Sequence, residues 1–543
     1  MSALSNRIGN HRGRTIVLTI VVLLAGLSAS VWVYAATGSV FAVRDYGAAG
    51  DATTLDTAAI QKAIDACHAN GGGKVYFPPG RYLSGTLFLK SNVRLHLESG
   101  AVLLGSTKLE HYPKTVQEFR SYTDNYTVRS LLYAEKAENI GIEGSGTIDG
   151  QGGAFEGEFK VRPYLIRIVS CKGVRMNDVT LRDSPMWTVH FLDCDTVAVD
   201  GVTIRTRVNN NNDGLDIDCC RNVRIANCDI WSGDDAIVLK STAFRPTQNV
   251  AISNCILSSN CNALKMGTES NGGFQQVVID NCVIYDTGMA GLTLQLVDGG
   301  TMEGITVSNL TMKNVGCPLF IRLGNRARPP APDMEKPGVG TLRNVTISNI
   351  EASGAQLTGC SITGIPGHCV ENVTLSNLRF SFVGGEGARG DVYAVPENVD
   401  QFPKHHMFGT LPSYGFFVRH VRNLRMRDIE VAFERRDDRP ALLCDDVDGI
   451  AIDGFKAMSS PEQDMIMGFR NVRNALIRGC MPADDAAVLL RLDGPQSANV
   501  VLDSNLIPEG VQAVVCGPAA SEGDAMNLQN QTLRKEPKRR NHR

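Results

Sequence analysis

Three aspartates in one short stretch have the residue types and spacing for acid–base chemistry. Asp213 lies in NNNNDGLDIDCC, and Asp234 and Asp235 lie in WSGDDAIVLKS, where Asp235 follows Asp213 by 22 residues. Both segments are turn-like and rich in Gly, Asn or Asp, and each leads into a short apolar β-type run. The stretch therefore predicts two acidic turns separated by one strand.

Such turns could hydrolyse a glycosidic bond if they were stacked. Stacked strands lie roughly 4.8 Å apart, and like charges at that separation raise at least one pKa. One carboxyl group then keeps a proton for the leaving oxygen while another stays ionised to activate water. A single turn aspartate more often only caps its turn, and carboxylates with carbonyls could instead bind Ca²⁺. Three acids on adjacent turns favour the catalytic interpretation, so we expect no metal and no cofactor.

A repeat predicts that these turns are indeed stacked. The pattern apolar-x-apolar-x-[Asn/Asp]-apolar recurs at intervals of 23 to 28 residues, interrupted by gaps of 40 and 51. Copies start at Val174, Val197, Val223, Val250, Val277, Ile305, Val345, Val373, Leu424 and Ile450, with weaker ones at Ala475 and Val500. This period fits a β-solenoid, in which each coil buries its face on the next, better than a leucine-rich repeat or a propeller. We predict an all-β, single-stranded, right-handed parallel β-helix, with the handedness taken from the rule for parallel crossovers.

Two sets of polar or small residues follow the same period. Asparagines that should hydrogen-bond along the stack are Asn227, Asn254, Asn281 and Asn309. Cysteines that should lie above one another are Cys228, Cys255 and Cys282. We interpret these cysteines as small buried hydrophobes, not as disulfides.

The chain divides into three parts. Residues 1–36 carry arginines before an apolar run, which predicts a signal peptide or, because the run is long enough to span a bilayer, a membrane anchor. Residues 37–520 should form the catalytic β-helix, and 521–543 a disordered polar tail. The body is therefore expected outside the cytoplasm, either secreted or periplasmic or tethered to a membrane.

A short helix should cover the first coil. Asp56 can cap it, and its apolar side is Ile60, Ala63, Ile64 and Cys67, at helical spacing. A solenoid exposes an unpaired strand edge at its first coil, and an amphipathic helix hides that edge. The net charge of −3 gives no support to nucleic-acid binding, and we expect a monomer.

Two insertions interrupt the period, at residues 325–340 and 383–414. Insertions in solenoids form loops on one face, often the binding face. Just before the first insertion, Arg322 falls on the apolar column of Leu239, Met266 and Leu294. Either the register slips by one residue there, which we favour, or Arg322 reaches into a groove.

The motifs resemble those of glycoside hydrolase family 28, the polygalacturonase and rhamnogalacturonan hydrolase family, between about residues 41 and 446. The family's Asn-x-Asp-Gly-x-Asp motif matches Asn211 to Asp216, and its Gly-Asp-Asp motif matches Gly233 to Asp235. The resemblance implies a pectin-degrading β-helix in which Asp234 is the general acid. It also implies that Asp213 and Asp235 hold and activate the water, with inversion.

Two family motifs are altered. The Gly-His-Gly histidine falls on Asn262, and the Arg-Ile-Lys motif that grips a galacturonate carboxylate is missing near residues 292–295. This predicts exo action, or action on pectin other than plain polygalacturonan. Candidate substrate-binding residues are Asn211, Asn262, Lys265, Glu269 and Arg322, with Arg326 as a further possible contact. Trp187 and His190 could form a sugar platform, although Trp187 could equally plug the core.

Two alternatives stay open. A polysaccharide lyase on the same solenoid would use Ca²⁺ and a basic residue, and the sequence shows no clear arginine or lysine beside the acids. A non-catalytic carbohydrate-binding solenoid would bind a polysaccharide without turnover. Fold alone does not separate these functions.

Overall fold

The computed structural model describes residues 39–533, except 159 and 386–392. The predicted export segment, 1–36, lies outside the described residues, as does the end of the tail. Within the described ranges, no helix is long and apolar enough to cross a bilayer. Helix α1 (Thr57–Ala69) is the single α-helix there, beside short 3-10 helices at Val43–Tyr46, Leu109–His111, Tyr122–Asn125, Gly152–Ala154 and Glu522–Asp524.

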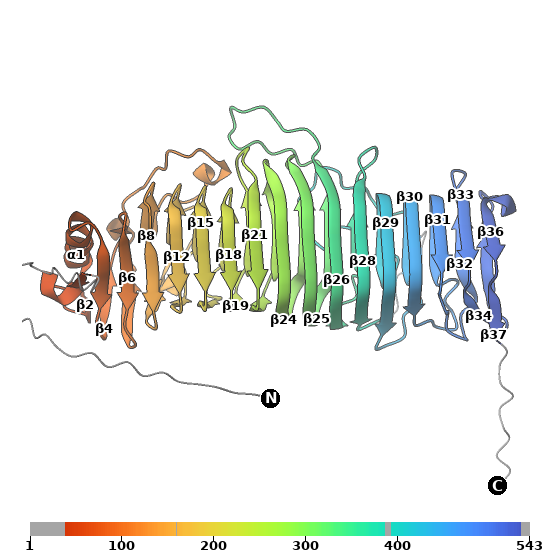
Figure 1. Ribbon diagram of the computed structural model, residues 1–543, viewed down its shortest axis with the longest axis horizontal. Helices are drawn as coiled ribbons and strands as arrows, with labels where there is room; N and C mark the ends of the chain where they lie inside the picture. Colours follow the sequence, from red (N-terminus) through yellow and green to blue (C-terminus); the bar gives the residue numbers. More distant parts are fainter. Residues whose placement is uncertain (1–38, 159, 386–392, 534–543) are drawn as a thin grey trace, which may run out of the picture. The chain divides into compact units, whose positions relative to one another are not determined.

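The strands stack in parallel as a β-helix with three strands to a coil (Figure 1). The first column is β1 (Val40–Ala42), β3 (Gly73–Phe77), β6 (Val93–Leu97), β9 (Gly141–Gly144), β12 (Lys172–Asn177), β15 (Asp195–Asp200), β18 (Arg221–Ala226) and β21 (Thr247–Ser253). The second is β2 (Asp51–Leu55), β4 (Gly80–Ser84), β7 (Ala101–Gly105), β10 (Thr147–Asp149), β13 (Thr180–Arg182), β16 (Thr203–Thr206), β19 (Asp229–Ser232) and β22 (Ile256–Ser259). The third is β5 (Leu87–Phe88), β8 (Ser130–Glu135), β11 (Tyr164–Val169), β14 (Val189–Leu192), β17 (Leu215–Asp218), β20 (Ile237–Ser241) and β23 (Leu264–Ser270).

The strands of the later coils are mostly longer. They are β24 (Gly273–Leu296), β25 (Thr301–Leu323), β26 (Thr341–Ala355), β27 (Cys360–Thr363), β28 (Val370–Phe382), β29 (Phe416–Phe433), β30 (Leu442–Ala457) and β31 (Met467–Arg478). The last coils are β32 (Val488–Asp493), β33 (Ala498–Asp503), β34 (Leu506–Pro508), β35 (Gln512–Cys516), β36 (Ala525–Leu528) and β37 (Gln531–Leu533). Strands β36 and β37 pair with β33 and β34, so the prediction of disorder from residue 521 is wrong up to Leu533.

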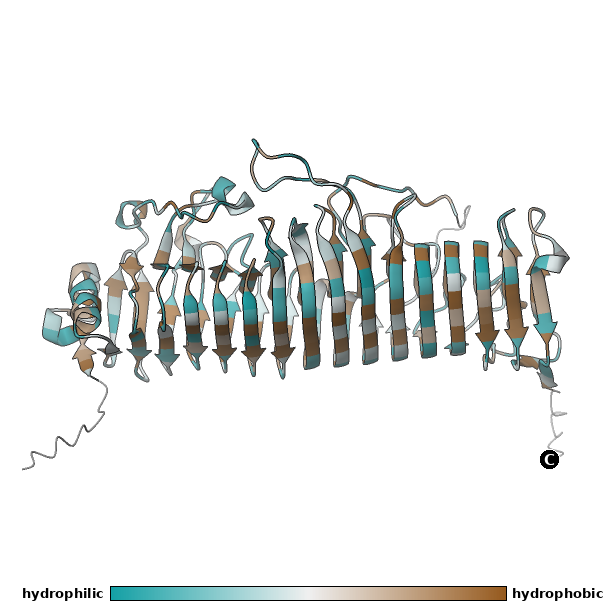
Figure 2. Cartoon of the chain, turned by 45° about the horizontal axis from the view of Figure 1, so that its top comes forward, coloured by the Kyte–Doolittle hydropathy of each residue, from teal (hydrophilic) through white to brown (hydrophobic). Residues whose placement is uncertain are grey.

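The repeat predicts the register correctly. Val223 pairs with Val250, which pairs with Val277, and so on to Ala475 with Val500. The inward side chains of these columns are buried, and their apolar bands continue from strand to strand in Figure 2. Burial of β-branched columns is what holds each coil on the next.

The asparagine ladder forms with one exception. Asn254 donates to Asn227 and Asn281 donates to Asn254, at 3.3 and 2.8 Å between nitrogen and oxygen. Asn309 donates instead to Asp280, at 2.7 Å. The cysteines of the predicted column, Cys228, Cys255 and Cys282, are buried and are not joined by disulfides.

Helix α1 buries the four predicted apolar residues against the first coils and lies at the N-terminal end of the stack (Figure 1). Asp56 occupies its N-cap position but does not cap the helix. Its carboxylate instead accepts from the Ala49 and Gly50 amides, at 2.7 and 2.9 Å, which ties the preceding loop to the helix start.

The register slips by one residue before Arg322. Leu239, Met266 and Leu294 form one column, which continues with Ile321, not with Arg322. The slip follows an irregular pairing between residues 287 and 290 of β24 and its partner β25. The predicted alternative of a slipped register is therefore confirmed.

Candidate active site

The structure brings the three predicted acids together. Asp213 precedes β17 and Asp235 precedes β20, and the register of these strands places the two residues at equivalent positions. One carboxylate oxygen from each of Asp213, Asp234 and Asp235 lies within 4.8 Å of the others. Gly214 permits this stacking, because a Cβ there would meet the Ala236 carbonyl oxygen at 2.4 Å.

Asp235 is held as a carboxylate. Its Oδ2 accepts from the Lys265 ammonium at 2.7 Å and its Oδ1 from the Asn262 amide at 2.7 Å. Burial is the largest influence and would raise the pKa of Asp235, but the charges of Lys265 and Lys240 and the hydrogen bonds from Lys265 and Asn262 together lower that pKa below its usual value. Asn262 and Lys265 were predicted to contact substrate, yet both side chains are engaged with this acid.

Asp234 has the opposite environment, although it is the next residue. It is partly open to solvent at the mouth of the site. Burial of its carboxyl group, and then the charge of Asp235, raise the pKa of Asp234. Adjacent acids with pKa values shifted in opposite directions are the arrangement of a proton donor beside an ionised partner.

Asp213 and Asp216 share one buried cation, Lys240. The Lys240 nitrogen lies 4.0 Å from an Asp213 oxygen and 3.6 Å from an Asp216 oxygen. Burial and the mutual repulsion of the two acids raise the pKa of Asp213 well above its usual value, and burial likewise raises that of Asp216. Asp213 Oδ1 and both Asp216 oxygens lack a hydrogen-bond partner, so this pair is only partly neutralised.

A β-bulge brings Glu269 to the same cation. Leu239 pairs with Met266 but Ser241 pairs with Ser270, so extra residues of β23 lie opposite Lys240. Glu269 then lies 3.5 Å from the Lys240 nitrogen. Although burial opposes it, Glu269 is the largest of the charges that raise the pKa of Lys240 well above its usual value.

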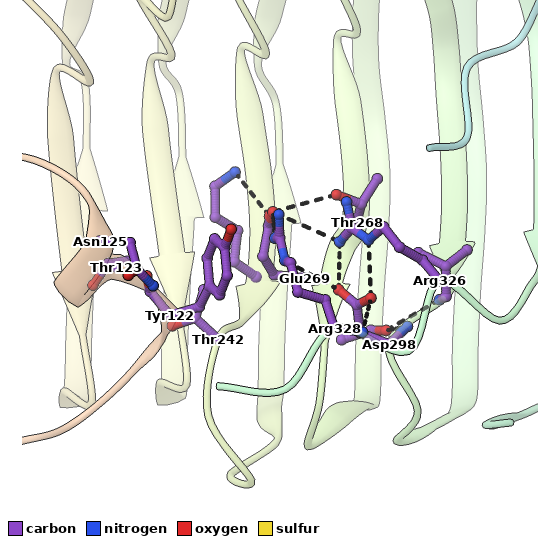
Figure 3. A network of polar contacts seen from close by, with 12 residues as sticks. Tyr122, Thr123, Asn125, Thr242, Thr268, Glu269, Asp298, Arg326 and Arg328 are labelled. Atoms are coloured by element: carbon purple, nitrogen blue, oxygen red, sulfur yellow. Dashed lines mark hydrogen bonds and ion pairs between the residues drawn. The ribbon is translucent and has the colours of Figure 1, made fainter. Parts of the chain in front are cut away.

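Glu269 also reaches the first insertion. Its carboxylate binds Arg328, and Arg326 binds the buried Asp298 next to it, so that all four belong to one network (Figure 3). The Arg328 guanidinium stacks 3.5 Å above the Tyr122 ring. The prediction that Glu269 contacts substrate is not supported, because its oxygens are committed to this network.

Other residues predicted to contact substrate also bind groups of the protein itself. Arg322 is 1% exposed and binds the carbonyls of Glu397 and Asn398, so it holds the second insertion rather than a substrate. Asn211 accepts from Arg162 at 3.3 Å. His190 is fully buried against Asp218, at 3.2 Å, so it cannot form a sugar platform.

Trp187 belongs to the floor of the site. It is 5% exposed and packs edge-on against Tyr164 and His190, which agrees with the core-plug alternative. The Lys240 nitrogen lies 4.4 Å above its ring. The ring thus supports the cation from below, as a cation–π contact.

No role was predicted for Lys240, although it follows the apolar run Ile237–Leu239 directly. A charged residue at the end of a buried strand is the signal that could have found it. Lys240 and Lys265 both lie beside the acids, although the sequence showed no clear arginine or lysine base there. Both are held as cations, because the surrounding acids raise their pKa values against the effect of burial.

The acid cluster could geometrically hold a metal ion through Asp213, Asp234 and Asp235. The two lysine ammonium groups already supply positive charge to Asp235 and to Asp213. A neighbouring pocket of about 230 Å³ opens beside Asp234 and Asp235. Its other walls are Cys261, Asn262, Lys265, Met289, Gln295, Phe402, Pro403 and Lys404.

Comparison with known proteins agrees with this geometry. The sequence profile of Glycosyl hydrolases family 28 matches residues 78–397, more than half of the chain. The chain belongs to this family. A "Probable polygalacturonase" of Vitis vinifera is 35% identical over 36% of this chain and 43% of its own length. An "Exo-poly-alpha-D-galacturonosidase" of Dickeya chrysanthemi is 30% identical over 36% and 41%, so the chain spans about two fifths of these relatives.

The family membership extends to the fold. The crystal structure of a hyperthermoactive exopolygalacturonase from Thermotoga maritima superposes with a TM-score of 0.58 at 22% identity, covering 73% of this chain and 92% of that one. At this identity the likeness concerns the fold alone. It confirms the predicted right-handed parallel β-helix.

Proposed function

We propose that this chain is an inverting glycoside hydrolase of pectic polysaccharides, with Asp234 as the proton donor. The observation that carries the proposal is the contrast between Asp234 and Asp235, whose pKa values are shifted in opposite directions. Family 28 membership and the names of the relatives support the substrate class.

In this mechanism the Asp234 proton passes to the glycosidic oxygen as the bond to the anomeric carbon breaks. Asp213 and Asp235 orient a water on the other side of that carbon, and the ionised Asp235 accepts its proton. Lys265 and Asn262 keep Asp235 ionised before the reaction. Lys240 offsets the negative charge of the buried pair Asp213 and Asp216.

The stereochemistry follows from which oxygens are available. The acids lie within 4.8 Å of one another, closer than the roughly 6.5–9.5 Å typical of inverting enzymes. A covalent route would nevertheless need a free carboxylate nucleophile. Asp235 is bound through both oxygens, and Asp213 has a raised pKa, so attack by water is favoured. Proton NMR of the first product anomer tests this: inversion is expected, and retention would contradict it.

Exo action is supported by the second insertion. Phe402, Pro403 and Lys404 line the pocket beside Asp234, where they would block a long chain from passing through. One relative that is named as an exo-acting enzyme agrees with this. We further propose that the chain acts outside the cytoplasm, as a monomer on polysaccharide.

The test is product analysis on plain polygalacturonan, rhamnogalacturonan and esterified pectin, with and without a strong chelator. Short products released from chain ends, undiminished by the chelator, are expected. Rapid loss of viscosity with plain polygalacturonan would contradict exo action. Products that absorb in the ultraviolet and require Ca²⁺ would indicate a lyase, and binding without any product a carbohydrate-binding solenoid.

A further inference from the structure

The second insertion forms one wall of the pocket beside Asp234, and hydrogen bonds hold this wall in place. Arg322 of β25 donates to the carbonyls of Glu397 and Asn398, at 2.7 and 3.1 Å. Arg419 of β29 donates to the carbonyls of Val395 and Pro396, at 2.6 and 2.9 Å. These buried guanidinium groups hold the backbone just before Phe402, so the wall is in place before any ligand binds.

The wall carries an exposed aromatic ring. Phe402 is 48% exposed and lines the pocket that contains Asp234. The Arg326 guanidinium lies 5.3 Å from the ring centre and is itself bound to Asp298. An exposed ring at a pocket of about 230 Å³ is suited to stack on the apolar face of one sugar unit.

The same pocket has one unused cation. Among the described residues, no acid pairs with the Lys404 ammonium, whereas Lys265 is bound to Asp235. Arg322 and Arg326 are likewise committed, to the insertion backbone and to Asp298. Lys404 is therefore the cation of this pocket that remains available for a ligand.

The pocket also has one unsatisfied acceptor. Gln295 of β24 is 2% exposed and lines the pocket, and its Oε1 has no hydrogen-bond partner. Its amide nitrogen donates to Thr293 Oγ1 at 3.0 Å, which fixes the orientation of the side chain. A buried acceptor without a donor is costly unless a ligand hydroxyl supplies one.

We propose that Phe402, Lys404 and Gln295 form a subsite for one acidic sugar unit beside Asp234. Phe402 stacks on the ring, Lys404 pairs with the carboxylate and Gln295 accepts from a hydroxyl. The subsite rests on the proposed hydrolase function and deepens it. It places the carboxylate-binding cation on the insertion, because residues 292–295 of this chain carry no cation.

The first test compares Lys404→Met with Lys336→Met, an exposed lysine of the other insertion that does not line the pocket. Substrates are an acidic oligogalacturonate and its methyl ester. Lys404→Met should raise KM for the acidic substrate about tenfold, the scale of one charge-assisted hydrogen bond, with little change for the ester. Lys336→Met should leave both unchanged. Equal effects of Lys404→Met on the two substrates, or none, would overturn the subsite.

A second variant, Gln295→Met, separates binding from stability. It removes the unsatisfied acceptor, so the melting temperature should hold or rise while KM increases for both substrates. A lower melting temperature with unchanged KM would show that Gln295 is structural. If the wild-type protein cleaves no pectic substrate, the proposed function fails. Calorimetric titration with trigalacturonate then decides the subsite alone: it stands if Lys404→Met weakens binding and falls if it does not.

Discussion

Two stacks of polar side chains on the same coils show what a solenoid does with neutral and with charged residues. In the asparagine ladder, Asn254 donates to Asn227 and accepts from Asn281. In the acid stack, Asp213 lies over Asp235 and retains an oxygen without a partner. The same repeat period produces both arrangements.

The difference lies in what a neighbour one coil away can offer. An amide is both donor and acceptor, so a column of amides satisfies itself. A carboxylate only accepts, so a column of acids must obtain donors from elsewhere, as Asp235 does from Lys265, or keep a proton. The acid stack therefore holds repulsion and raised pKa values that the ladder lacks, and hydrolysis can use them.

The largest effect is expected from Asp234→Asn. The substitution keeps the volume and removes the transferable proton, so turnover should fall by roughly 10²–10⁴-fold. Because the pKa of Asp234 is raised on folding, stability falls as the pH rises above the pKa of the unfolded chain, and the loss is complete above the folded pKa. The melting temperature at neutral pH should therefore hold or rise.

Asp213→Asn and Asp235→Asn provide the comparison. Each should be comparably damaging, and combining either with Asp234→Asn should add far less than the product of the single effects, because the acids act as a unit. Near-normal turnover by a folded Asp234→Asn protein would show that the stack is structural or binds metal.

The second-largest effect is expected from Lys265→Met, which removes the charged donor to Asp235 from the acid stack. Lys265 lowers the pKa of Asp235, so Asp235 stabilises the fold above its unfolded pKa, and that contribution is lost as the pH falls through its folded pKa. Removing Lys265 should destabilise the protein at neutral pH by about 3–5 kcal/mol, since it leaves a buried charge unpaired. The stability deficit should shrink toward acid pH.

The pH dependence of activity should report the same loss of the Lys265 charge. If Asp235 must be ionised, the acid limb of kcat/KM should move to higher pH in Lys265→Met, while Lys265→Arg should restore much of it. The alkaline limb, which reflects loss of the Asp234 proton, should move less. An unmoved acid limb in a folded Lys265→Met protein would show that Lys265 does not set the charge of Asp235.

A smaller effect, of opposite sign, is expected from Asp216→Asn. Both Asp216 oxygens lack hydrogen bonds, and burial raises its pKa well above the usual value. Its ionised form therefore costs stability at neutral pH, and the variant should gain about 1–2 kcal/mol there. Denaturant melts at pH 7 and at acid pH measure this, and the gain should vanish where Asp216 is protonated. Destabilisation at pH 7 would mean that its pairing with Lys240 outweighs the repulsion.

The sequence predicts what the period controls. The copies of the repeat give the register from Val174 to Val500, and the turn positions of Asp213 and Asp235 follow from that register. Residues that depart from the period were harder to place. The bulge that brings Glu269 to Lys240 could not be read from the repeat period. Its effect depends on which residue of the neighbouring coil lies opposite the inserted residues.

Long-range partners could not be predicted for the same reason. Arg322 was expected to slip in register, and it does, but its partners lie in an insertion some 75 residues later. Nothing in local sequence specifies that a loop will present carbonyls to a particular guanidinium. Strands β36 and β37 were missed because they are short and are stabilised by pairing with β33 and β34.

The smallest effect should come from the neutral ladder, through Asn254→Gly. Asn254 has a φ of 56°, a left-handed conformation that glycine adopts freely, so the backbone should remain unchanged. The variant loses two exposed amide hydrogen bonds, and the free energy of unfolding should fall by about 0.5–1 kcal/mol, independent of pH because no group titrates. Asn254→Asp still accepts from Asn281 but no longer donates to Asn227, so its loss should be smaller near neutral pH. Denaturant unfolding at two pH values measures both. If Asn254→Gly were as damaging as Lys265→Met, the ladder would be under the same stress as the acid stack, and the distinction between self-satisfied amides and stacked carboxylates would not hold.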